Sequence, residues 1–119
     1  MTPAEIMNGL QARNRELSSK NDELIQLTES AAEAKREYLI AMASKTTELR
    51  LAGEPIGIIR DLIKGDKAVA NLQYKWDIAD GVLLACRERI KDIREAIGTY
   101  RSILTWLREE LRTTPNQEM

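Results

Sequence analysis

The feature that most constrains this chain is an apolar heptad pattern that continues without a break from Val69 to Leu111. In alternating steps of three and four residues, every position is apolar or aromatic: Val69, Leu72, Trp76, Ala79, Leu83, Cys86, Ile90, Ile93, Ile97, Tyr100, Leu104, Leu107 and Leu111. This spacing keeps one apolar face along an α-helix and is typical of coiled coils. We therefore expect a helix over residues 67–112 that packs lengthwise against another helix.

A second heptad pattern occupies the first part of the chain. It covers residues 6–41 in steps of four and three, with Arg13 and Lys20 as two cationic interruptions. Gly53 follows this segment, and glycine commonly ends a helix in the left-handed conformation. The pattern predicts a long helix over residues 3–52.

Local signals mark the helix ends and a corner between the two heptad segments. Thr2 and Glu5 have the spacing of a capping box at the start of the first helix. Residues 53–66, GEPIGIIRDLIKGD, hold a proline that can begin a helix and a glycine that can end one. We expect a short helix over residues 55–64, with Asp66 as the cap of the helix that follows.

These elements together predict an all-α fold. The chain of 119 residues has no Phe and only three Pro, and no segment has the pattern of repeated strands. Its length is that of one domain. We expect a single helical domain over residues 1–112, built as a long antiparallel, coiled-coil-like hairpin with a short corner helix, and a flexible tail over residues 113–119.

The apolar stripe of the last helix is wider than a hairpin requires. With Val69 as heptad position a, the g positions include Ala68, Val82, Ala96 and Ile103. A two-helix hairpin covers little beyond positions a and d, so the extra width favours a homodimer that forms a four-helix bundle. The residues predicted at this oligomer or partner interface are Val69, Leu72, Trp76, Val82, Leu83, Ile90, Ile97, Ile103 and Leu104.

Charged rows flank the apolar stripe. Position e of the last helix carries Arg87, Arg94, Arg101 and Arg108, and position g of the first helix carries Glu16 and Glu23. An antiparallel pairing places Glu23 near the level of Arg94 and Glu16 near that of Arg101, so we expect charge pairing within a bundle or between chains. The alternative is phosphate contact, because a line of guanidinium groups attracts a nucleic-acid backbone. Neighbouring acidic residues such as Asp92 weaken that attraction.

The sequence offers no recognisable catalytic, cofactor or metal site. It has no histidine, its one cysteine, Cys86, occupies a core d position, and its glycines match no phosphate-binding loop. We therefore expect no enzyme activity and no cofactor. Trp106 and Tyr74 lie outside the heptad stripe, where a neighbouring helix, a partner or stacked bases could cover them. Gly81 and Gly98 indicate either close helix approach or tolerated helix weakness.

Charge and hydropathy bear on location. The formal net charge is −1, and no apolar run approaches the ~18 residues that a membrane-spanning helix needs. The first residues lack the basic start and the apolar block of a signal peptide. We expect a cytoplasmic protein with no membrane partner.

The corner and the segment after it resemble small helical proteins encoded by bacteriophages and prophages. The similarity covers roughly residues 45–110 and rests on the turn pattern GxPxxxIxxLxKGD, on YKWDIA at residues 74–79, and on a heptad helix that ends near a tryptophan. The resemblance implies action inside a bacterial host and transfers no functional residue.

Two functions are consistent with this sequence. The first is a non-catalytic, self-associating interaction or scaffold protein of phage or prophage origin, whose expected partner is itself, with another phage or host protein as a further candidate. The alternative is a nucleic-acid-binding accessory protein of phage replication or recombination, motivated by the arginine row.

Overall fold

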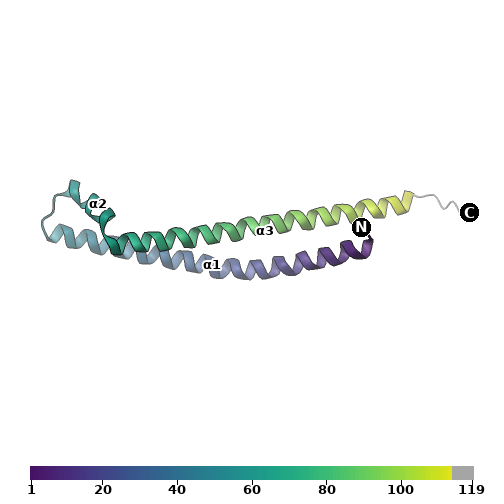
Figure 1. Cartoon of the computed structure of the whole chain (residues 1–119), viewed down its shortest axis with the longest axis horizontal. Helices are drawn as coiled ribbons and strands as arrows, with labels where there is room; N and C mark the ends of the chain where they lie inside the picture. Colours follow the sequence, from purple (N-terminus) through teal and green to yellow (C-terminus); the bar gives the residue numbers. More distant parts are fainter. Residues whose placement is uncertain (114–119) are drawn as a thin grey trace, which may run out of the picture. The chain divides into compact units, whose positions relative to one another are not determined.

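The computed structural model describes residues 1–113, which form three helices and no strand (Figure 1). Helix α1 spans Pro3–Leu51, α2 spans Ile56–Gly65 and α3 spans Lys67–Thr113. The predicted all-α class is confirmed, and each predicted helix boundary lies within one residue of the observed one. Thr113, which we expected in the tail, is the last residue of α3, and the rest of that predicted tail lies outside the described residues.

The ends of α1 have the expected capping interactions. The backbone N–H of Glu5 donates to the hydroxyl of Thr2 (3.1 Å), and the backbone N–H of Thr2 donates to the carboxylate of Glu5 (3.3 Å). At the other end Gly53 has a φ of 80°, and the Glu54 N–H donates to the Leu49 carbonyl. Together they form a Schellman motif, which closes the helix because only glycine adopts this conformation without strain.

Pro55 and Asp66 each precede one of the two helices that follow α1. Pro55 is the N-cap of α2 rather than its first helical residue, with φ −62° and ψ 139°. Its carbonyl accepts hydrogen bonds from the N–H groups of Ile58 and Ile59. Asp66 caps α3 as predicted, because its carboxylate accepts the N–H of Val69 at 3.0 Å.

The chain packs as two compact units, and α1 and α3 each contribute to both of them. The first unit combines Met1–Glu23 with residues 86–113, and the second consists of Leu24–Ala85. Each unit has its own buried side chains and its own pairing of α1 with α3.

The first unit pairs the start of α1 with the second half of α3 in antiparallel orientation. Ile6 and Ile93 are its most deeply buried side chains, with exposures of 0% and 1%. The thiol of Cys86 donates to the Lys20 carbonyl at 3.7 Å. A Cβ atom placed on Gly9 would lie 2.7 Å from the Tyr100 ring. Gly9 therefore leaves the space that this aromatic ring fills.

The second unit packs the end of α1, all of α2 and the start of α3 (Figure 1). Its buried side chains come from all three helices: Ala31, Ala34, Ile59, Val69 and Leu83. The rings of Tyr38 and Trp76 lie 5.4 Å apart between centroids, and the Lys35 ammonium lies 5.8 Å from the Trp76 ring. These contacts hold the two long helices together next to the corner.

Candidate interaction surfaces

Most of the predicted interface residues belong to the cores of their own units. The buried ones are Val69, Leu83, Ile90 and Ile97. The half-buried ones are Leu72, Trp76, Ile103 and Leu104. Only Val82 is exposed, at 45%. The a and d positions therefore serve first to join α1 to α3 within each unit, which is the usual role of such positions in an antiparallel pair.

An exposed apolar row lies on the part of α3 that belongs to the second unit. Tyr74, Ile78 and Val82 follow each other at intervals of four residues, with exposures of 68%, 51% and 45%. Residues four apart share one side of a helix, so these three form a continuous surface, which we name the outer stripe. Gly81 lies beside it, and a Cβ atom placed on Gly81 would meet nothing within 4 Å. Contiguous exposed apolar surface of this kind is typical of interaction sites.

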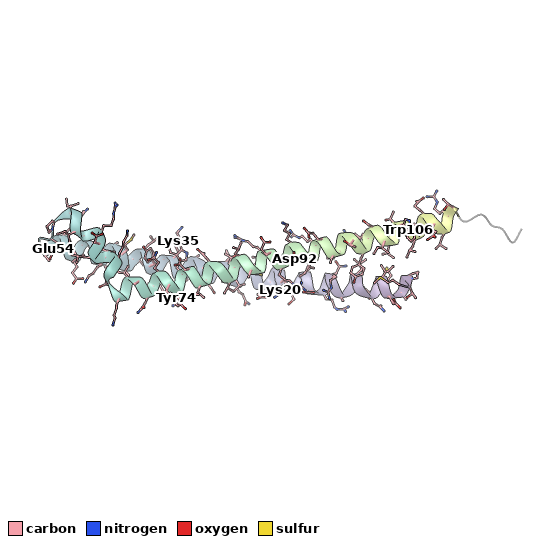
Figure 2. The ribbon with its side chains drawn as sticks, turned by 45° about the horizontal axis from the view of Figure 1, so that its top comes forward. Lys20, Lys35, Glu54, Tyr74, Asp92 and Trp106 are labelled. Atoms are coloured by element: carbon pink, nitrogen blue, oxygen red, sulfur yellow. The ribbon has the colours of Figure 1, made fainter. Side chains whose placement is uncertain are left out.

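The two aromatic residues outside the heptad stripe remain exposed within their units. Tyr74 is 68% and Trp106 is 63% exposed, and Figure 2 labels both on α3. Next to Trp106 a shallow hollow is lined by Gly98 and Ile103, among others. Among the described residues, no helix of the same unit covers either aromatic ring.

The arginine row lies on the part of α3 that belongs to the first unit. Its members, Arg87, Arg94, Arg101 and Arg108, are all exposed. None of them forms an ion pair with another described residue. The heptad spacing places the four guanidinium groups along one side of the helix, at intervals of about 10 Å.

The glutamates predicted to face this row have other partners. Glu16 pairs with Arg89, which is a g position of α3, and with Arg13 one turn earlier in α1. Glu23 pairs with Lys20 at 2.9 Å. The prediction that Glu16 lies near the level of Arg101 is wrong. Glu16 contacts Arg89, and Arg89 and Arg101 are separated by about 18 Å along the helix axis. A heptad pattern alone permits several registers, and the side chains of this unit select a different one.

Ion pairs in the second unit connect α1 to α3 and to the Asp66 cap of α3. Lys75 pairs with Glu37 at 3.3 Å, and Lys45 pairs with both Glu48 (3.4 Å) and Asp66 (3.5 Å). The charge of Glu48, followed by that of Asp66, raises the pKa of Lys45. The hydrogen bond from the Val69 N–H, with the nearby Lys45 charge, lowers the pKa of Asp66. The cap of α3 is thus an ionised carboxylate tied to the end of α1.

In the first unit, a neighbouring carboxylate also raises the pKa of one lysine. The hydrogen bond and the charge of Glu23 raise the pKa of Lys20. Lys20 occupies a core position of the α1 heptad pattern, and its ammonium reaches the partly exposed Glu23 carboxylate one turn further on. The cationic interruption of the heptad is therefore accommodated by a long side chain that carries its charge out toward solvent.

A groove in the second unit was not predicted from the sequence. It has a volume of ≈ 570 Å³ and is lined by residues of all three helices. Its apolar lining includes Met42, Ile59 and Ile63, and its cations are Arg50, Arg60 and Lys64: we name it the basic groove. The sequence feature that could have indicated this groove is the pattern of α2, in which isoleucines and cations occupy neighbouring sides of one short helix.

Cys86, the only thiol, is buried. Within residues 1–113 no three acidic or cysteine side chains come together in a way that could hold a metal ion. None of the helices described over the same residues combines the length and the apolar character required to traverse a bilayer.

Comparisons of this chain with known protein families, with curated proteins and with solved structures found no match. The resemblance to phage and prophage helical proteins therefore stays a prediction, and the functional conclusions below depend on the surfaces of the molecule itself.

Proposed function

We propose that this protein is a non-catalytic interaction or scaffold protein that associates with itself through the outer stripe of α3. The observation that supports this proposal most directly is the exposure of Tyr74, Ile78 and Val82 on one side of the helix. In the proposed assembly, α1 and α3 form one antiparallel hairpin, and two hairpins make a four-helix bundle. In keeping with the sequence resemblance, we place it in the cytoplasm of a bacterial host, encoded by a phage or prophage.

The proposal modifies the interface that the sequence suggested. Val82 belongs to both versions, but residues such as Ile90 and Ile97 are already covered within their own unit. They could contact a second copy only if the two chains exchanged helices. The outer stripe requires no exchange, because its side chains are already exposed.

Light scattering coupled to size-exclusion chromatography tests self-association. We expect the wild-type protein to have the mass of a dimer at micromolar concentration. The triple variant Tyr74→Ser, Ile78→Ser, Val82→Ser should have the mass of a monomer and keep its helical circular dichroism. Leu84→Ser is the matched control, because Leu84 is 57% exposed but lies outside the stripe. A wild-type monomer at these concentrations would rule out the proposal.

Nucleic-acid binding is the second candidate, and the unpaired arginine row of the first unit favours it. Four exposed guanidinium groups on one side of a helix can each neutralise a phosphate, which makes affinity fall steeply with salt. We expect binding of single- or double-stranded DNA at low salt to weaken in Arg94→Glu with Arg101→Glu. An absence of binding at low salt, or binding that this double variant leaves unchanged, would eliminate this candidate.

A further inference from the structure

We propose that the basic groove of the second unit binds an acidic amphipathic helix of a partner protein. The groove and the outer stripe have no residue in common, so this inference goes beyond self-association and does not depend on it. The shape of the groove, its apolar lining and the sign of its charges all favour such a partner.

The shape of the groove suits a helix. On α1 its lining residues recur at every fourth position, as Tyr38, Met42, Thr46 and Arg50. These positions span about 18 Å along the helix axis, which equals roughly three helical turns. α2 and the start of α3 supply the rest of the lining. An elongated groove between helices is the setting in which an amphipathic helix places its apolar face.

The apolar side chains that line the groove are only partly buried. Of its lining residues, Ile59 and Val69 are buried, whereas Ile56 is 80% exposed. Met42 lies in the lining from the α1 side, and methionine adapts its shape to different apolar partners. The groove has a volume of ≈ 570 Å³, into which apolar side chains of a partner helix can insert.

The charges around the groove define the chemistry of the partner. Three of its lining residues are cations, Arg50, Arg60 and Lys64, and none is acidic. None of the three forms an ion pair with another described residue. The C-terminal turns of helices favour cations, which accounts for Arg50 and Lys64. Arg60 lies in the middle of α2, so the helix dipole does not explain it. Carboxylates on the rim of a bound helix would pair with all three.

The test uses three fluorescein-labelled peptides of about 18 residues, a length at which isolated helices begin to form. The first has leucines at helical spacing and glutamates elsewhere, the second has lysine in place of glutamate, and the third is a scrambled form of the first. Fluorescence anisotropy with the full chain measures binding. We expect saturable binding of the first peptide alone. Equal binding of the scrambled peptide would overturn the proposal, because it would show attraction by charge without a helical apolar face.

Variants locate the site. Arg60→Glu with Lys64→Glu should weaken binding of the acidic peptide about tenfold or more. Ile56→Ser should weaken it as well, without loss of fold, because this side chain is exposed. Lys67→Glu is the matched control: Lys67 is an exposed cation of the same unit outside the groove, and its substitution should leave the affinity nearly unchanged. Equal weakening by the control and the double variant would contradict the assignment.

Two further outcomes identify other occupants and would overturn the proposal. Binding of dodecanoate without binding of the acidic peptide would make the groove a site for a small amphipathic acid. A lower mass of Arg60→Glu with Lys64→Glu in light scattering would make a second copy of this chain the occupant. The Tyr74→Ser, Ile78→Ser, Val82→Ser variant should bind the peptide as the wild type does, which separates a failure of self-association from a failure of this proposal.

Discussion

At the scale of single residues, two glycines inside the long helices have opposite environments. A Cβ on Gly9 would lie 2.7 Å from the Tyr100 ring, whereas a Cβ on Gly98 would meet nothing within 4 Å. Of the two explanations left open for Gly98, tolerated helix weakness applies. The sequence did not identify Gly9 as a contact, because close approach depends on which ring the helix register brings opposite.

These environments predict opposite effects of the same substitution. Gly98→Ala should raise the free energy of unfolding by about 0.5–1 kcal/mol, because alanine favours the helix. Gly9→Ala should lower it by up to about 2 kcal/mol, because overpacking by the added methyl group costs about 1–3 kcal/mol and the helix preference of alanine offsets about 0.5–1 kcal/mol of that cost. Urea unfolding followed by circular dichroism measures both. The Gly9→Ala defect should largely disappear in a Tyr100→Leu background, and stabilisation by Gly9→Ala in the wild type would contradict the observed contact.

The apolar side chains of the helices should also differ in how much each contributes to the free energy of unfolding. Ile93 is 1% exposed and Ile25 is 61% exposed, although both are isoleucines inside a long helix. Ile93→Ala should lower the free energy of unfolding by about 2–5 kcal/mol, since it leaves a cavity. Ile25→Ala should change it by about 0.5 kcal/mol or less. Denaturant unfolding compares the two variants, and similar losses would show that the core is not where the packing places it.

At the scale of elements, the helix boundaries could be predicted because each end has a local signal. The capping box of Thr2 and Glu5, the left-handed Gly53 and the cap at Asp66 are short-range features that act independently of tertiary packing. The partner of each charged side chain could not be predicted. Glu16 pairs with Arg89, and a heptad pattern is compatible with many such levels because it repeats every seven residues.

The cap of α3 predicts a specific dependence on pH. The pKa of Asp66 is lower in the folded state than its ordinary value of 3.8. The ionised carboxylate therefore stabilises the fold fully at pH values above 3.8. This contribution is lost as the pH falls through the lowered pKa. Asp66→Asn keeps a capping side chain but loses the charge that pairs with Lys45. The stability difference between wild type and Asp66→Asn should therefore vanish at low pH.

Urea unfolding of both proteins between pH 7 and pH 2 measures this difference. Asp61→Asn controls for the general effect of removing one carboxylate from α2 and its surroundings. A difference between wild type and Asp66→Asn that stayed constant down to pH 2 would show that the Asp66 charge contributes nothing to the junction of α1 and α3.

At the scale of the whole molecule, the sequence predicted that α3 has more apolar surface than a two-helix pair can bury, but it identified only some of the exposed residues. The g positions of α3 pointed to Val82, which is exposed, but Ile78 at position c was not among the predicted interface residues, although it is 51% exposed. A heptad analysis weights positions a, d and g and leaves out the outer face. The basic groove was missed for a different reason, because it exists only once α2 packs against both long helices.

Self-association through the outer stripe also predicts a concentration-dependent Tm. A dimer that unfolds to monomers gains about 1.4 kcal/mol for each tenfold rise in protein concentration, which corresponds to about 3–5 °C for two chains of this length. Calorimetry of the wild type at 2 and 200 μM, concentrations chosen to bracket a micromolar dimer, should therefore give clearly different Tm values. The Tyr74→Ser, Ile78→Ser, Val82→Ser variant should melt at one temperature throughout, whereas Leu84→Ser should behave as the wild type does. A wild-type Tm independent of concentration would mean that the outer stripe, though exposed, does not join two copies of this chain.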